Sequence, residues 1–199
     1  MSQFLNPFRP ARRRRLAPWL LAAAGWASAL AAGAQAAEPA ALQSIERLDL
    51  PRYLGTWYEV ARFPNRFQKQ CVADSRADYQ SQPDGTVRVL NQCRRADGRV
   101  DQAVGQARQI GAADSPRLQV RFAPAWLSFI PAVWGDYWVI DLDEAYQLAA
   151  VSEPRREYLW VLSRTPSVPA PVYDALLKRL AAQGLEVGRL ERSPQSTAP

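Results

Sequence analysis

Few side chains in this 199-residue sequence are suited to catalysis or to metal binding. It contains no histidine, so the commonest general base and the commonest metal ligand are both missing. The strongest nucleophiles would be its two cysteines, Cys71 and Cys93; without a free thiol, only carboxylates and Tyr137 are left. We therefore expect a binding protein rather than an enzyme, with no catalytic residue, no metal and no cofactor.

The two cysteines flank a predicted β-hairpin. Residues 72–80 and 86–92 read as strands, and Pro83-Asp84-Gly85 between them is a turn signal. The two sulfur atoms would then meet at the open end of the hairpin. Because an even number of cysteines outside the cytosol favours pairing, we predict a Cys71–Cys93 disulfide in preference to a reactive thiol or a metal site.

The rest of the chain has the alternation that is typical of an all-β protein. In the clearest run, Leu118, Val120 and Phe122 share one face of a predicted strand. With the hairpin, the strands predicted over residues 57–62, 103–110, 118–122, 137–141, 147–151 and 159–162 make a set of about eight, a number that closes into a small barrel.

One helix is expected after the last long strand. Val172, Leu176, Leu177 and Leu180 recur at helical spacing, with Ser167 as a cap and Gly184 as a stop signal. Its apolar stripe must pack against another element. The strands at residues 137–140 and 159–162 are apolar on both faces, so one face can point into the barrel while the other lies under the helix.

Small residues on the predicted inner face favour a hollow barrel. If Tyr79 points inward, so do Ala77, Ser75 and Ala73, while Gly105 and Ala107 do the same on a later strand. A barrel of this size either is packed by its side chains or holds one ligand. Close packing by aromatic rings is thus the alternative to a cavity.

Most of the net charge of +6 belongs to the N-terminus. Residues 1–37 hold five arginines and no acid, which leaves 20 basic and 19 acidic residues and no basic face for nucleic acid. The run Arg12–Arg15, the apolar residues 16–30 and Ala34-Gln35-Ala36 predict a secretory signal over residues 1–36. The alternative is an uncleaved membrane anchor. Residues 37–192 would form one domain, and residues 193–199 a disordered tail.

Three motifs in order resemble the signature regions of the lipocalins: Gly55-x-Trp57, Asp136-Tyr137 and Ser163-Arg164-Thr165-Pro166. Residues 53–62 and 158–166 are most similar to the bacterial, apolipoprotein D-like branch. The likeness runs from about residue 50 to residue 190. It implies an eight-stranded antiparallel up-and-down barrel with one C-terminal α-helix packed outside. It also implies structural roles for Gly55, Trp57 and Arg164, with Arg164 lying across the Trp57 ring at the closed base.

The same resemblance places the ligand at the open end, among the loops 63–70, 94–98, 123–134 and 153–156. Aromatic residues that match Trp134 and Trp160 line the pocket in related bacterial lipocalins. The expected ligand-binding residues are therefore Trp134, Tyr137 and Trp160, with Phe63, Phe67, Val89 and Phe122 as an apolar wall. Arg62 and Arg66 near the mouth could meet a carboxylate or phosphate.

These residues make a fatty acid or lysophospholipid the leading ligand, bound for transport, storage or membrane maintenance in the cell envelope. The signal segment holds no lipid-attachment cysteine, so a soluble periplasmic protein is expected. Loop 123–134 is unusually apolar; it would line the entrance, touch a membrane surface, pair two barrels into a homodimer, or fold over its own strands. Two rival functions stay open, namely an interaction module with a filled barrel and an isomerase or de-epoxidase on a similar barrel.

Overall fold

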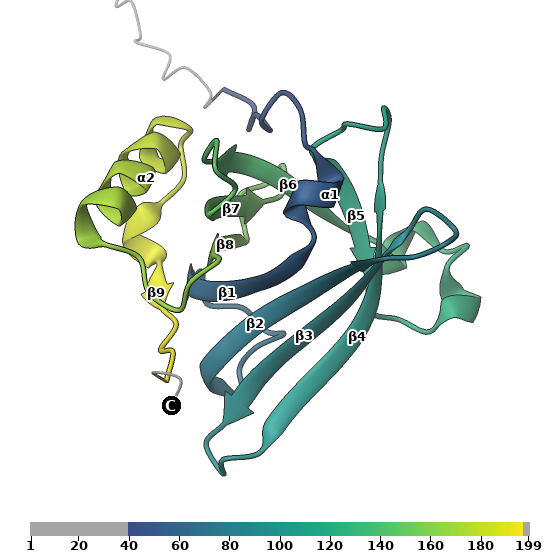
Figure 1. Ribbon diagram of the computed structural model, residues 1–199, viewed down its shortest axis with the longest axis horizontal. Coiled ribbons are helices and arrows are strands. Elements are labelled where there is room, and N and C mark those ends of the chain that lie inside the picture. The colour runs from purple at the N-terminus through teal and green to yellow at the C-terminus, as the bar shows by residue number, and fades with distance from the viewer. Residues whose placement is uncertain (1–39, 197–199) are drawn as a thin grey trace, which may run out of the picture. The chain divides into compact units, whose positions relative to one another are not determined.

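The computed structural model describes residues 40–196, and the predicted signal segment lies outside these residues (Figure 1). All strands belong to one antiparallel sheet in the order β2-β3-β4-β5-β6-β7-β8-β1-β9, and β1 also pairs with β2. The predicted eight-stranded antiparallel barrel is thus confirmed, with one extra strand. The strands are β1 (Gly55–Arg62), β2 (Cys71–Ser81), β3 (Val87–Arg95), β4 (Val100–Gln109), β5 (Arg117–Arg121), β6 (Gly135–Leu142), β7 (Leu148–Ser152), β8 (Leu159–Ser163) and β9 (Glu191–Arg192).

Over residues 40–196, two α-helices and three short 3-10 helices connect or cover the strands. They are α1 (Leu50–Tyr53), η1 (Ala125–Leu127), η2 (Pro131–Val133), α2 (Ala170–Ala182) and η3 (Val187–Arg189). Within residues 40–196 no helix is long and apolar enough to cross a membrane. Helix α1 precedes β1 and carries Tyr53, whose side chain is buried in the barrel core.

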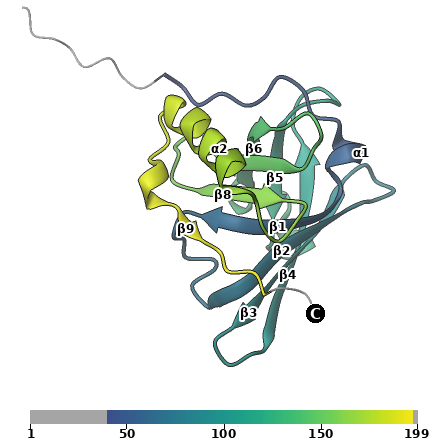
Figure 2. The same ribbon diagram turned by 60° about the vertical axis from the view of Figure 1, so that its left-hand side comes forward.

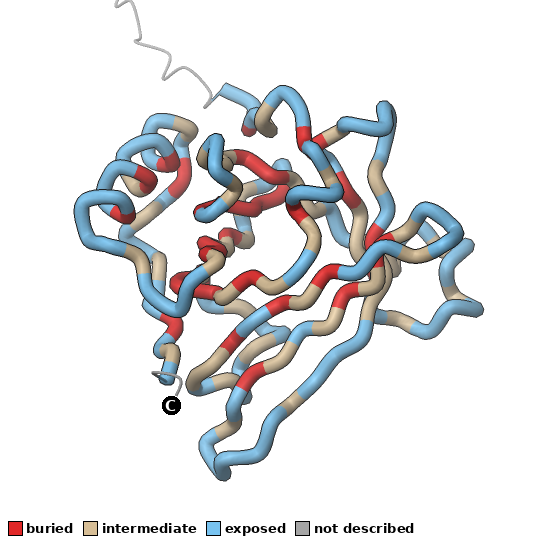
Figure 3. Tube along the Cα trace, in the orientation of Figure 1, coloured by how far each residue is buried: buried red, intermediate tan, exposed pale blue. Residues whose placement is uncertain are grey.

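The sheet has a buried cluster on each of its faces, which Figure 3 shows as buried stretches along the central strands. The inner cluster includes Trp57, Tyr79, Val89 and Leu162. The outer cluster joins alternate residues of the same strands, such as Val161, to helix α2 (Figure 2). The double-sided apolar pattern of β6 and β8 therefore has the predicted cause, because one face fills the barrel and the other lies under a helix.

Helix α2 differs from its prediction at its start and along its apolar stripe. Pro169 holds the cap position without a side-chain hydrogen bond, so the prediction of Ser167 as cap is wrong. Pro171 near the start has a fixed φ and no N–H, so this end needs fewer capping acceptors. The buried stripe includes Tyr173 and Leu176, whereas Val172 is 49% exposed. The helix ends as predicted before Gly184, which has a φ of +78°.

After β9, residues 193–196 follow the edges of β1 and β2 and hydrogen-bond to them, while the disordered tail over residues 193–199 stays a prediction. Strand β1 pairs with β2 only from Gly55 to Tyr58. Beyond that point Ser193 donates its N–H to the Val60 carbonyl, and the side-chain amide of Gln195 donates to the carbonyls of Glu59 and Ser75. Backbone groups of separated strand edges need partners, and residues 193–196 supply them. Residues 197–199 lie outside the described part.

Replacing Leu176 by alanine should lower the free energy of unfolding by about 2–5 kcal/mol, because the side chain is completely buried between α2 and the barrel. Val172→Ala on the same helix is the matched control and should change stability by less than about 0.5 kcal/mol, since Val172 is half-exposed. Urea denaturation followed by circular dichroism measures both changes. Equal losses in the two variants would contradict the described packing of α2.

Candidate functional site

The closed end of the barrel is organised around Trp57 and Arg164. Trp57 is fully buried, and the guanidinium carbon of Arg164 lies 3.9 Å from the centroid of its indole ring. The same guanidinium donates to the carbonyls of Arg52 at 2.8 Å, Thr56 at 2.9 Å and Tyr146 at 3.2 Å. It therefore links helix α1, strand β1 and the β6–β7 turn.

Gly55 is needed where this cation crosses the strand. Its φ is +93°, a left-handed conformation that other residues rarely adopt, and a Cβ atom there would lie 3.4 Å from Nη1 of Arg164. Trp57 completes the base by donating from Nε1 to the Tyr53 carbonyl at 2.8 Å. This hydrogen bond holds the short helix α1 against the end of the barrel.

Three tyrosine hydroxyls meet inside the barrel above Trp57. The Tyr137 oxygen lies 2.9 Å from that of Tyr53 and 3.0 Å from that of Tyr79. The Tyr53 ring packs on Trp57 with a centroid distance of 4.9 Å. Burial raises the pKa of Tyr53 and Tyr137 well above the usual value, and raises the pKa of Tyr79 to about 12. This tyrosine cluster is therefore neutral at physiological pH.

Nearer the mouth, a polar chain crosses the interior. Nε1 of Trp160 donates to Oε1 of Gln68 at 2.9 Å, and Nε2 of Gln68 donates to the Glu59 carboxylate at 2.6 Å. Glu59 is buried and forms a 2.6 Å ion pair with Arg62. The Trp160 ring also stacks on Tyr158, with centroids 5.8 Å apart. Loop 63–70 is thereby tied to the barrel wall through Gln68.

Four of the seven predicted ligand-binding residues lie on the inner side of the barrel. Val89 is buried opposite Gly105, and the Phe122 ring closes over Gly105, where an added Cβ would lie 2.8 Å from two ring carbons. Tyr137 and Trp160 are inward and only partly buried. These four side chains come from β3, β6, β8 and the end of β5, so they surround the interior.

Phe67 lies at the rim, whereas the predicted wall residue Phe63 and the predicted ligand contact Trp134 lie on the outer face. Phe67 is 54% exposed, and its ring centroid is 5.6 Å from that of Tyr158. A register shift in β1 between Glu59 and Ala61 reverses the alternation, so Phe63 joins the cluster under α2. Trp134 precedes Gly135, which pairs with the inward Val120, so Trp134 points outward.

The Trp134 ring contacts cations on the outer face of the barrel. It lies 4.1 Å from the guanidinium carbon of Arg108 and 5.1 Å from that of Arg121. Its Nε1 donates to the Ser128 carbonyl at 2.9 Å. Trp134 is thus separated from Tyr137 and Trp160, with which the sequence grouped it.

Several interior residues were absent from the predicted site. Glu59 and Gln68 form the polar chain, and Tyr53 and Tyr79 complete the tyrosine cluster. Glu59 is two residues after Trp57, so period-two alternation could have placed it inside. Tyr53 had no such signal, because α1 must fold under the barrel before its side chain turns inward.

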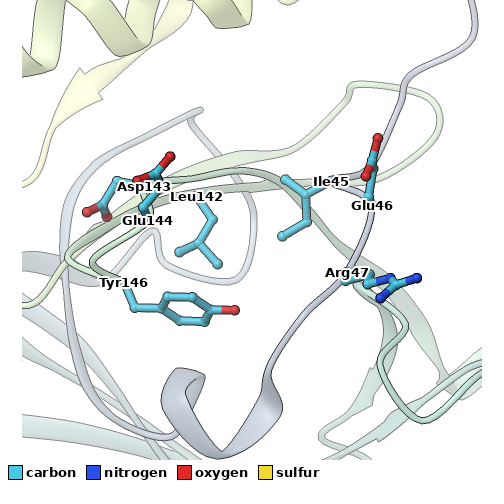
Figure 4. Close-up of a pocket in the computed structure, with 7 residues that line it drawn as sticks. All are labelled: Ile45, Glu46, Arg47, Leu142, Asp143, Glu144 and Tyr146. Atoms are coloured by element: carbon cyan, nitrogen blue, oxygen red, sulfur yellow. The ribbon is translucent and has the colours of Figure 1, made fainter.

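In the described part of the chain, one open pocket lies at the mouth of the barrel and another at its closed end. The pocket at the mouth has a volume of about 490 Å³ and is lined by Arg62, Pro64, Asn65, Arg66, Gln68, Lys69, Cys71 and Glu191. The pocket at the closed end has about 310 Å³, and Figure 4 shows the side chains around it: Ile45, Glu46, Arg47, Leu142, Asp143, Glu144 and Tyr146. The first is mainly basic, whereas the second carries both signs of charge.

The predicted disulfide between Cys71 and Cys93 is confirmed, and it joins the start of β2 to β3 beside the mouth pocket. On another part of the mouth, the loop between β5 and β6 exposes 72% of Trp126 and 77% of Phe129. Among residues 40–196, no group of three or more histidine, cysteine, aspartate or glutamate side chains is placed to hold a metal ion. The site consists of an aromatic interior and a basic entrance.

Such a barrel, with a closed tryptophan base and an open mouth, is the architecture of small-molecule carriers of the lipocalin type. The family model of the lipocalin-like domain matches residues 48–195, and the chain belongs to the lipocalin family. The sequence-based assignment is confirmed.

Relatives of this family come from plants, bacteria and animals. Temperature-induced lipocalin-1 of Arabidopsis thaliana is 39% identical over 79% of this chain and 85% of its own. Outer membrane lipoprotein Blc of Escherichia coli K12 is 36% identical over 88% of this chain and 94% of its own length. Apolipoprotein D of Macaca fascicularis is 32% identical over 77% of this chain and 80% of its own length. Apocrustacyanin C1 has a similar fold, with a TM-score of 0.58 at 12% identity over 75% of this chain and 81% of its own.

Arg164→Lys should destabilise the protein by about 2–4 kcal/mol, because lysine loses the stacking on Trp57 and cannot reach three carbonyls from one planar group. The matched control is Arg155→Lys, whose side chain is 73% exposed and whose ion pairs contribute little. Guanidinium denaturation compares the two. A midpoint for Arg164→Lys equal to that of the control would show that the base does not depend on this cation.

Three of the seven tyrosines should resist ionisation well above pH 10 while the protein is folded. Unfolded tyrosines release their protons near pH 10. The stability that the folded protein gains by keeping these three hydroxyls protonated is therefore fully present below about pH 10, and it is lost as the pH rises toward about 12. Tyrosinate absorbance, recorded together with circular dichroism, measures the ionisation. A single transition of all seven near pH 10 in folded protein would refute the buried cluster.

Proposed function

We propose that this lipocalin carries a fatty acid or a lysophospholipid, with its acyl chain inside the barrel and its head group at the basic mouth. The observation that carries the proposal is the position of the mouth pocket, which shares Gln68 with the interior ring of Trp160. One ligand could therefore contact both regions. The proposed role is transport, storage or membrane maintenance, without chemistry on the ligand.

The charges at the mouth favour an anionic head group. Glu59 already neutralises Arg62, at 2.6 Å. Arg66 and Lys69 are exposed, and within the described residues neither has a carboxylate at ion-pair distance. Glu191 also lines the mouth pocket, but Arg66 and Lys69 together leave it with a net positive charge that can meet a carboxylate or a phosphate.

The interior favours an unbranched apolar chain. Val89 and Phe122 provide apolar surface, and Tyr137 and Trp160 keep part of their surface accessible. Each methylene transferred from water contributes about 0.8 kcal/mol, so about twelve of them supply roughly 10 kcal/mol before the costs of ordering. That amount is enough for useful affinity without specific polar contacts along the chain.

The proposed location is the periplasm, where the protein would be soluble after cleavage of residues 1–36. The disulfide suits an oxidising compartment. The relative in Escherichia coli is named an outer membrane lipoprotein, which also supports a role in the cell envelope. Retention by an uncleaved N-terminal segment is the alternative location.

A second candidate function uses loop 123–134 as an interaction surface. Trp126 and Phe129 are its most exposed apolar side chains, and large exposed aromatic groups often mark a contact site. In this alternative the loop binds a protein, a second copy of the chain or a membrane, and the barrel carries nothing.

Binding of palmitic acid and palmitoyl lysophosphatidylglycerol, measured by isothermal titration calorimetry, tests the two functions. Trp160→Glu should lose binding, because it buries a second carboxylate beside Glu59, while circular dichroism verifies the fold. The double variant Arg66→Glu/Lys69→Glu should lower the affinity for the anionic lipids about tenfold but leave the affinity for hexadecanol, which has no charge, unchanged. The control Trp126→Glu should bind normally.

If the wild-type protein binds neither lipid, the proposed carrier function is rejected. If Trp126→Glu then abolishes association with vesicles or with a second copy, the interaction module is the better account.

A further inference from the structure

The tyrosine cluster (Tyr53, Tyr79 and Tyr137) has one hydroxyl hydrogen more than its internal hydrogen bonds use. Three hydroxyl groups bring three hydrogens, and each hydroxyl can donate once. The cluster contains two hydrogen bonds, both to the Tyr137 oxygen. Among residues 40–196, no other side chain or backbone group is hydrogen-bonded to these oxygens. One donor therefore has no protein acceptor.

The free hydrogen is best assigned to Tyr137. Tyr53 is 2% exposed and Tyr79 is 9% exposed, whereas Tyr137 is only partly buried. A buried donor without an acceptor costs about 1–3 kcal/mol, so the arrangement with its free donor at the accessible ring is favoured. In that arrangement Tyr53 and Tyr79 both donate to Tyr137, and the Tyr137 hydroxyl points its hydrogen toward the interior.

The surroundings of this donor suit an uncharged acceptor. Raised pKa values keep all three tyrosines in the neutral, donating form. Arg164, the cation whose charge acts on Tyr53 and Tyr79, is already bound to three backbone carbonyls and to the Trp57 ring. A carboxylate at this depth would lose its hydration without gaining a free cation. A carbonyl or ether oxygen carries no charge, so burying it costs much less hydration free energy than burying a carboxylate.

We infer that the tyrosine cluster is a second, polar binding point for the ligand, which accepts an acyl chain bearing a neutral oxygen near the end remote from the head group. This inference rests on the proposed function, since it assumes that the chain enters the barrel with its head group at the mouth. It narrows the ligand class from plain acyl chains to chains that carry a terminal or near-terminal carbonyl or ether oxygen.

The test compares hexadecanoic acid with 15-oxohexadecanoic acid, which adds one ketone near the buried end. For wild-type protein we expect the oxo acid to bind roughly three- to tenfold more tightly, the range that one net hydrogen bond provides. In Tyr137→Phe the ratio of the two affinities should fall to one or reverse, and because this ratio is taken within the variant, it is read independently of any change in the affinity for hexadecanoic acid itself. The matched control is Tyr173→Phe, because Tyr173 belongs to α2 and packs in the cluster on the outer face of the barrel.

The possible outcomes separate this inference from the proposed function. Equal affinity for both acids in wild-type protein, or an unchanged preference in Tyr137→Phe, overturns the inference alone. Binding of the oxo acid only, dependent on Tyr137, supports the inference and rejects plain fatty acids as ligands. If neither acid binds, both the inference and the proposed function are overturned.

Discussion

The contact between the Arg164 guanidinium and the Trp57 ring is the interaction on which the rest of the barrel depends. One planar cation covers the indole at 3.9 Å and also satisfies carbonyls from α1, β1 and the β6–β7 turn. Helix α1 and strand β1 follow each other in the chain, whereas the β6–β7 turn comes much later in the sequence, and this one cation bonds to all three. With α1 fixed, Tyr53 is held inside the barrel, where it can meet Tyr79 and Tyr137.

The opposite end combines a chain of polar groups with the stacked rings of Tyr158 and Trp160. The register shift in β1 turns Phe63 outward, and the buried Glu59 organises Arg62 and Gln68 around the entrance. The segment 193–196 closes the gap where β1 and β2 separate, and the disulfide fixes the start of β2. A closed base thus lies opposite an entrance whose cationic side chains are exposed, and this asymmetry suits the proposed carrier of an amphiphile.

Local sequence patterns predicted the features that depend on neighbouring residues. Alternation located the strands, the Pro83-Asp84-Gly85 turn set the hairpin, and the hairpin brought the two cysteines together. Patterns failed where one residue changes the register or where the partner is remote. The shift in β1 reverses the face of Phe63. Trp134 was placed inside by its resemblance to relatives, although it is three residues from the inward Tyr137 and alternation puts these two side chains on opposite faces. The hydrogen bonds of segment 193–196 depend on β1 and β2, more than a hundred residues earlier.

The most direct test of the carrier account is native mass spectrometry of the full chain secreted to the periplasm, followed by identification of any lipid that remains bound. The account predicts one single-chain anionic lipid per barrel, released when the protein is denatured. A barrel that emerges empty and stays empty after incubation with fatty acids and lysophospholipids would contradict it.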